Sequence, residues 1–192
     1  MRALTPRMAA VAAAVLVLAG ITTPAVAAEP STTVRGAVAA DGLPDPTDVV
    51  ENADGTTTLV FDDGATFTSQ DVPTPAGGDG ARTLLAASAS FPWSATYDAS
   101  ITSRSWTTSR SGDVWVDVRS ITSCGGKAHN LALYRLGGGS WSRVGTVRSV
   151  SCSGGSYVWR AVAQGTYRFR LWDPDTGDAY RNHAASGTVR YP

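Results

Sequence analysis

The sequence is poor in the side chains that most catalytic and metal sites require. The 192-residue chain has two cysteines and two histidines, and residues 91–192 contain no glutamate and one lysine. A glycosidase with paired carboxylates would have to use two aspartates there. No serine lies in a G-x-S-x-G motif, and CxxC and HxxxH spacings are absent. We therefore expect no cofactor, no dedicated metal site and no recognisable catalytic residue.

The sequence also lacks a hydrophobic run long enough for a permanent membrane anchor, which takes about 20 residues. Its apolar run at residues 8–18 follows Arg2 and Arg7 and precedes Ala-Val-Ala at residues 25–27. This order predicts a Sec-type signal peptide over residues 1–27. We therefore expect a secreted, extracellular protein with no membrane anchor.

Both cysteines lie in one stretch, and export predicts that they are oxidised. Cys124 and Cys152 are placed symmetrically about Gly138, the middle of a Gly-Gly-Gly turn. A hairpin folded at that turn brings them together, and the resulting disulfide would contribute about 3–4 kcal/mol to stability. The alternative is a metal site of the two thiols with His129, but one nearby imidazole is a poor ligand set. The pattern favours the disulfide.

Charge divides the mature chain into two parts. Residues 28–90 carry ten acidic and two basic residues, whereas residues 91–192 carry twelve basic and six acidic residues. We predict that residues 28–88 are an acidic leader, linker or pro-segment, partly disordered, with one hairpin in "TTTLVFDDGATFTS" turning at Asp63-Gly64. This segment either covers the basic domain, until cleavage near Arg82, or is simply solvated.

The second part, residues 89–192, alternates apolar and polar residues. In "GDVWVDVRS" the valines share one face, and in "GTYRFRLWD" Tyr167, Phe169 and Leu171 do the same. About eight such short segments are separated by Gly and Ser, without a helical period. This pattern predicts an all-β fold, a jelly-roll-like β-sandwich of about eight strands with one disulfide.

Four of these segments carry a family resemblance. "GDVWVDVRS", "NLALYR", "GTYRFRLWD" and "ASGTVRYP" resemble the strands of the bacterial pre-peptidase C-terminal domain family, over roughly the last 80 residues. The chain also resembles small secreted β-sandwich proteins of actinobacteria. The resemblance implies a secreted jelly-roll module. The chain departs from the family in lacking an attached peptidase and in having "NLALYR" where the family prefers Asp-Leu-Tyr.

The polar faces of the strands predict one function, a non-catalytic binding module. Arginine forks grip phosphate or carboxylate groups, and indole rings stack on sugars. The expected partners are anionic cell-wall polymer, acidic polysaccharide or another extracellular protein; nucleic acid is not expected. The alternative is that the arginines pair with Asp113 and Asp117 across strands. If their strands are neighbours, the binding face consists of Trp115, Arg119, Arg168, Arg170, Trp172 and Arg190.

A different class of function is a secreted hydrolase or toxin. Its site would be assembled from His129, His183 and one of Asp98, Asp113 or Asp117. Each histidine is expected in a loop beside a strand, where a solvated residue is more common than a general base. The geometry discriminates: the hydrolase needs a histidine within hydrogen-bond reach of an aspartate or a hydroxyl.

One further segment, "DPDTGD", has two interpretations. Asp173, Asp175 and Asp178 could supply oxygen ligands to calcium. Pro174 and Gly177 instead suit a tight turn, and the glycine lies one position early for a calcium-binding EF-hand loop, whose glutamate is also missing. The turn is favoured, and calcium remains the weaker alternative.

Overall fold

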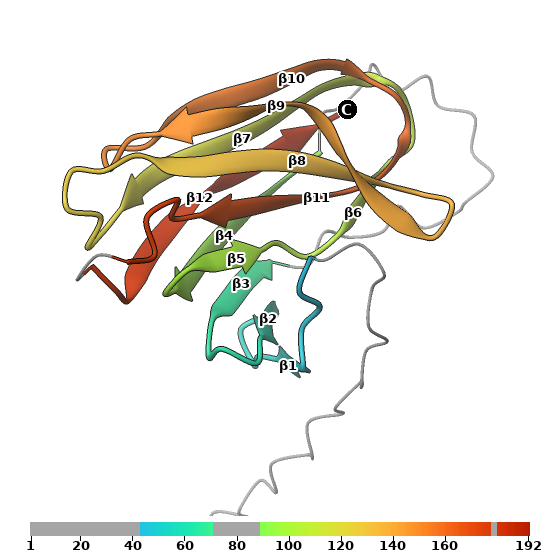
Figure 1. Ribbon diagram of the computed structural model, residues 1–192. Helices are drawn as coiled ribbons and strands as arrows, with labels where there is room; N and C mark the ends of the chain where they lie inside the picture. The colour runs from blue at the N-terminus through green and yellow to red at the C-terminus, as the bar shows by residue number, and fades with distance from the viewer. Residues whose placement is uncertain (1–42, 71–88, 178–179) are drawn as a thin grey trace, which may run out of the picture. The chain divides into compact units, whose positions relative to one another are not determined.

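The computed structural model describes residues 43–70, 89–177 and 180–192 of the chain. Within these residues the protein is all-β, with twelve strands in two antiparallel sheets that pack as a sandwich (Figure 1). No helix in the described part is long and apolar enough to cross a membrane. About eight strands were expected in residues 89–192; the described residues of that part form nine, and residues 48–70 contribute three more.

The larger sheet has seven strands in the order β1-β2-β3-β4-β12-β7-β10, and the smaller has the order β5-β11-β8-β9, with β6 also paired to β11. Figure 1 shows β8 and β11 in one layer and β4, β7 and β12 in the other. The strands are β1 (Asp48–Glu51), β2 (Thr56–Val60), β3 (Thr66–Gln70), β4 (Ala89–Tyr97), β5 (Ser100–Thr102), β6 (Trp106–Thr108), β7 (Gly112–Ile121), β8 (His129–Gly137), β9 (Ser140–Val150), β10 (Gly155–Val162), β11 (Gly165–Trp172) and β12 (His183–Tyr191).

The core lies between the two sheets and follows from the alternation in the sequence. In β7, Val114, Val116 and Val118 point inward and are buried, while the residues between them face outward. The inward-facing residues of β11 are likewise buried. Where β7 pairs with β12, a β-bulge between Val118 and Ser120 inserts an extra residue, so Ser120 again faces outward.

Aromatic side chains join the sheets near the middle of the core. Phe67 of β3 stacks on Trp93 of β4, with ring centroids 5.9 Å apart and ring planes at 16°. Phe169 of β11, from the opposite sheet, meets the edge of Phe67 at 5.8 Å and lies 5.0 Å from Trp93. Phe67 therefore ties the hairpin of β2 and β3 to both sheets.

The sequence placed residues 28–88 in a leader ahead of the sandwich. The described part of that segment, residues 43–70, instead supplies three strands to the larger sheet, because β3 pairs with β4. The predicted hairpin is confirmed: β2 and β3 pair with Thr58 opposite Thr68, and Gly64 has the positive φ of 80° that its turn requires. The apolar residues Leu59 and Phe67 alternate with threonines and reach the common core.

The predicted disulfide between Cys124 and Cys152 is confirmed. Strands β8 and β9 form a hairpin that turns at Gly138-Gly139, and both glycines have positive φ, as a tight two-residue turn requires. The pairing contains a bulge between Leu131 and Leu133. Because both sulfur atoms are in the disulfide, the alternative metal site of the thiols is wrong.

Candidate functional site

The six residues of the predicted binding face lie on two different sheets. Trp115 and Arg119 of β7 and Arg190 of β12 belong to the seven-stranded sheet, where β7 and β12 are neighbours. Arg168, Arg170 and Trp172 belong to β11, whose neighbours are β5, β6 and β8 of the other sheet. The six residues therefore form two separate clusters, one on each outer face.

In the first cluster the guanidinium of Arg190 lies 5.0 Å from the ring centre of Trp115. Its Nε and Nη2 donate to the two carboxylate oxygens of Asp117, at 2.9 and 3.2 Å. Partial burial works against ionisation of Asp117. Hydrogen bonds from Arg190 and Ser156 outweigh this effect, so the pKa of Asp117 lies below its ordinary value. The predicted alternative of cross-strand pairing thus holds for this arginine.

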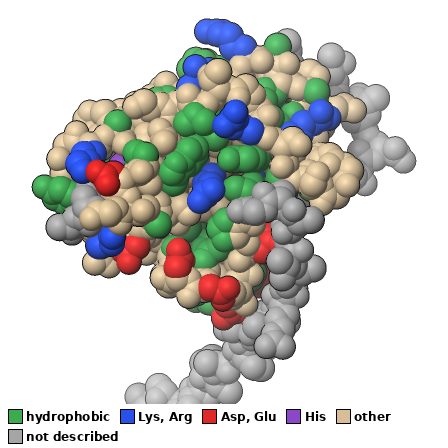
Figure 2. All heavy atoms as spheres, viewed as in Figure 1, with side chains coloured by type: hydrophobic (Ala, Val, Ile, Leu, Met, Phe, Trp, Pro, Cys, Tyr) green, Lys and Arg blue, Asp and Glu red, His purple; other side chains and the backbone are tan. Residues whose placement is uncertain are grey.

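In the second cluster Arg168 is largely buried, although it faces away from the core. Its guanidinium lies 4.1 Å from the ring centre of Trp141 and 3.1 Å from Oδ1 of Asp45. Beside it, Arg170 lies over Trp172, with 5.5 Å between the guanidinium and the ring centre. In Figure 2, basic side chains lie among hydrophobic ones over β8 and β11.

Asp45 comes from the segment that the sequence identified as acidic, so one contact between that segment and the basic strand β11 is present. A cover of the basic face requires contacts of this kind. Whether the segment is removed or displaced stays a prediction. Residues 71–88, with the proposed cleavage region, lie outside the described residues.

A groove of about 450 Å³ lies on the outer face of the seven-stranded sheet. Its neighbouring strands carry small outward side chains at opposing positions, for example Ser94 opposite Ser186, so no large side chain fills the space. Hydroxyl groups also pair across the strands, with 2.8 Å between Oγ1 of Thr66 and Oγ1 of Thr96. The lining residues are Thr66, Thr68, Ser94, Ala95, Thr96, Ser120, Thr122, Ala184, Ala185 and Ser186.

The groove was not predicted from the sequence. Seven of its ten lining residues are Ser or Thr, and the other three are Ala. Outward-facing Ser and Thr are common on solvated strands, so such residues indicate a groove only once the strand order is known. The sequence offered one signal for the groove. After the proline of "SFPWSATY", and throughout "HAASG", every outward-facing side chain is small and uncharged.

The histidines lie in the interior, and the prediction that they are solvated loop residues is wrong. His129 begins β8 and His183 begins β12, and both side chains are 0 % exposed. Each continues the inward face of its strand, His129 with Leu131 and His183 with Ala185. Asp173 follows β11 directly, continues the inward face of Leu171, and is 4 % exposed.

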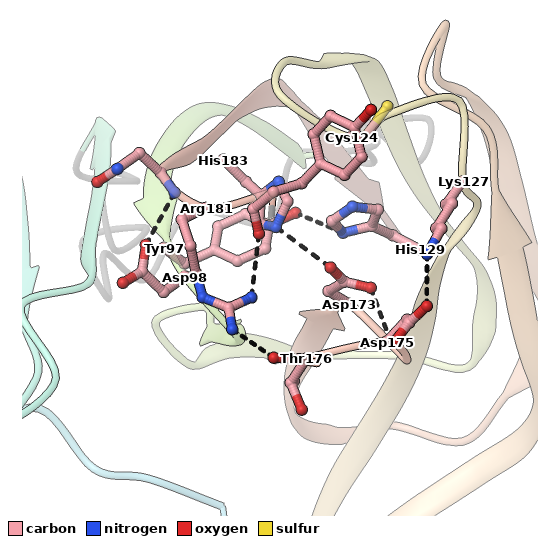
Figure 3. A network of polar contacts seen from close by, with 12 residues as sticks. Tyr97, Asp98, Cys124, Lys127, His129, Asp173, Asp175, Thr176, Arg181 and His183 are labelled. Atoms are coloured by element: carbon pink, nitrogen blue, oxygen red, sulfur yellow. Dashed lines mark hydrogen bonds and ion pairs between the residues drawn. The ribbon is translucent and has the colours of Figure 1, made fainter. Parts of the chain in front are cut away.

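These residues and Tyr97 converge at one end of the sandwich (Figure 3). The Tyr97 hydroxyl lies 3.1 Å from Nδ1 of His129, and Nε2 of His183 lies 3.4 Å from Oδ2 of Asp173. The two imidazole centres are 4.6 Å apart. Burial, and next the charge of Asp173, raise the pKa of Tyr97 well above its ordinary value, so its hydroxyl stays protonated.

One ligand atom from each of His129, Asp173 and His183 lies within 4.8 Å of the others. These three residues could therefore hold a metal ion. The weaker calcium alternative in "DPDTGD" requires its aspartates to point at one ion. Asp173 instead lies against His183, and Asp175 pairs with Lys127. The backbone N–H of Asp175 also donates to Oδ1 of Asp173 at 2.8 Å, which forms a local turn. The third residue, Asp178, lies outside the described residues.

The aspartate that meets a histidine is not one that the sequence singled out. Asp98 accepts a hydrogen bond from the backbone N–H of Asn182 at 2.8 Å, Asp113 lies 3.4 Å from Arg160, and Asp117 pairs as described above. No family model and no curated protein matches this chain, so its function is inferred from its own residues. The resemblance to the pre-peptidase C-terminal domain family stays a prediction.

Proposed function

We propose that the protein is a secreted, non-catalytic β-sandwich that binds a cell-wall or other extracellular polysaccharide in the hydroxyl-lined groove of its seven-stranded sheet. The groove carries this proposal. Ser and Thr hydroxyls donate and accept hydrogen bonds and rotate to suit their partner, which matches the mixed donors and acceptors of a sugar. Ordered water can complete such contacts.

The stacked pair of Arg190 and Trp115 extends the same face. Trp115 lies five residues from Ser120 along β7, about 17 Å away at the rise of a strand. A ligand of several sugar units could therefore reach from the groove to the indole ring. Arg190 is already paired with Asp117, which favours a neutral or weakly charged glycan over a polyanion.

Separate observations support export and the jelly-roll topology. The expected signal peptide and the disulfide are both typical of secreted proteins. With β6 set aside, the strands from β4 onward have the orders β4-β12-β7-β10 and β5-β11-β8-β9. We infer from these orders that this part of the chain is a jelly roll, with β1–β3 extending its larger sheet.

The alternative function, a hydrolase, is supported by one contact between a histidine and an aspartate, but both side chains are buried from a substrate. Asp173 lies close enough to His183 for an acid–base pair. A substrate, however, would have to reach side chains that are 0 % and 4 % exposed. The geometry therefore favours binding over catalysis.

Binding is tested by sedimenting the full chain with insoluble peptidoglycan, chitin and cellulose. Ser186→Tyr places a large side chain in the groove and should weaken binding at least about tenfold, a loss of about 1.4 kcal/mol. Ser142→Tyr, on the exposed face of β9 in the other sheet, is the matched control and should bind normally.

Salt separates a neutral glycan from a polyanion. At about 1 M salt, where the Debye length is about 3 Å, attraction between exposed charges is largely screened. Binding in the groove should persist under that condition, whereas loss of binding would indicate a polyanion held by arginines. No sedimentation with any of the three polymers, or equal binding by both variants, would contradict the proposal.

A further inference from the structure

The four polar residues at the end of the core come from both sheets. His183, at the start of β12, lies opposite Tyr97, at the end of β4, in the seven-stranded sheet. His129 begins β8 and Asp173 follows β11, and these strands are antiparallel neighbours in the five-stranded sheet. A ligand held by His129, Asp173 and His183 would therefore join the two sheets.

The distances suit a small cation of the zinc type. Two donors bound about 2.0–2.2 Å from a tetrahedral Zn²⁺ lie about 3.4 Å apart. Nε2 of His183 and Oδ2 of Asp173 are 3.4 Å apart. The third ligand atom, from His129, lies within 4.8 Å of both, so binding of an ion would draw the three donor atoms closer together.

The kind of ligand selects the ion. Imidazole nitrogens suit zinc and neighbouring transition metals, whereas calcium and magnesium prefer oxygen ligands alone. Two imidazoles and one carboxylate are a common ligand set for zinc, with a fourth position filled by water or another oxygen. The Tyr97 hydroxyl lies 3.1 Å from Nδ1 of His129, so it contacts one of the three ligand residues by a hydrogen bond (Figure 3).

Burial adds an independent reason. A carboxylate and two imidazoles in the core lose their hydration, which is costly unless other groups replace it. Asp173 receives one backbone hydrogen bond, from Asp175. Among the described residues, Nδ1 of His183 has no hydrogen-bond partner although it is buried. A divalent cation would offset the carboxylate charge and compensate the lost hydration of the imidazoles.

We infer that His129, Asp173 and His183 form a structural binding site for Zn²⁺ or a similar divalent transition-metal ion, which holds β8, β11 and β12 together. Cys124 lies five residues before His129 in the connection between β7 and β8, so the ion and the disulfide stabilise the same end of the sandwich. The site is separate from the groove, and it does not depend on the proposed polysaccharide binding.

The test begins with unfolding, because the buried site would be loaded as the chain folds. The full chain, with its disulfide intact, is unfolded in denaturant and refolded with Zn²⁺, with Ca²⁺ or with a chelator. After gel filtration the zinc-refolded protein should contain about one zinc per chain, and its thermal midpoint should exceed that of the chelator sample. Calcium should give neither effect.

Variants then assign the ligands. Asp173→Asn and His183→Gln should reduce the zinc content to a small fraction of one ion per chain. Asp175→Asn is the matched control, since it removes the next aspartate of the same loop, which pairs with Lys127 at the surface. It should retain the full zinc content. Refolding with Co²⁺ adds a visible absorption spectrum that reports a four-coordinate site in the wild type and Asp175→Asn.

Several outcomes would overturn the inference, and the first two do not depend on whether a variant folds. They are a wild-type protein without zinc after refolding in excess Zn²⁺, and a thermal midpoint that zinc leaves unchanged. Equal zinc contents in the wild type and in a folded Asp173→Asn variant would place the ion elsewhere. Zinc lost from Asp175→Asn as well would do the same.

Discussion

Replacing Phe67 by alanine should destabilise the whole sandwich. The side chain is 0 % exposed, stacks on Trp93 and meets the edge of Phe169 in the opposite sheet. Truncation of a buried phenylalanine costs about 3–5 kcal/mol, because apolar contacts are lost and a cavity remains. Since a domain is stable by only about 5–15 kcal/mol, this is a large share of the total.

Urea unfolding measures the effect. With an m-value of about 2 kcal/mol/M, the loss corresponds to a fall of roughly 1.5–2.5 M in the urea midpoint. Tryptophan fluorescence and far-UV circular dichroism should fall together, because Phe67 belongs to the same core as the tryptophan-bearing strands.

The neighbouring Thr68 provides the control for Phe67→Ala. Thr68 faces outward, and its hydroxyl lies 2.8 Å from that of Thr58, so Thr68→Ala should cost only about 0.5–1.5 kcal/mol. If Phe67→Ala shifts the midpoint no further than Thr68→Ala, residues 48–70 are not part of the cooperative core. That result would support the division expected from the sequence, with a separate leader before a sandwich domain that begins at residue 89.

Three further predictions concern the cross-link and the charged surface. Replacing Cys124 and Cys152 by alanine together should lower the free energy of unfolding by about 3–4 kcal/mol, which urea unfolding measures, because the disulfide closes a long loop; a loss below about 1 kcal/mol would contradict this. The folded pKa of Asp117 lies below its ordinary value of 3.8, so its stabilising effect is present above that pH and is lost as pH falls through the lowered value. Asp117→Asn should therefore flatten the acid limb of stability against pH, and an unchanged limb would show that the ion pair contributes nothing. Asp45→Asn removes the carboxylate beside Arg168, so the variant should elute from an anionic resin at higher salt than one unit of charge explains; a shift no larger than that would argue against a cover.

The strands and the disulfide could be predicted from local patterns. The valines of "GDVWVDVRS" alternate with polar residues, and period-two alternation directly indicates one buried face. The expected signal peptide and the turn at Gly138 likewise sufficed to predict the disulfide of Cys124 and Cys152, because hairpin geometry is local. These features need no knowledge of which distant strands are neighbours.

The candidate sites required that knowledge. Arg168 and Arg190 lie on similar alternating strands, but β11 and β12 belong to different sheets, and no local pattern states this. The buried cluster left a weak signal in the sequence. His129, His183 and Asp173 each occupy the next inward-facing position beyond the apolar residues of their strands. That signal indicates burial, but only the pairing of β8 with β11 and the packing of the two sheets bring these three strand ends together.

The central claim, that a polysaccharide binds in the groove, is tested most directly by nuclear magnetic resonance. The isotopically labelled full chain is titrated with a soluble oligosaccharide from the polymer that sediments it. Amide shifts should concentrate on the groove, at residues such as Thr66, Thr96 and Ser186, and extend toward Trp115. Shifts confined to the outer face of β11, around Trp172, or the absence of saturable shifts, would contradict the account.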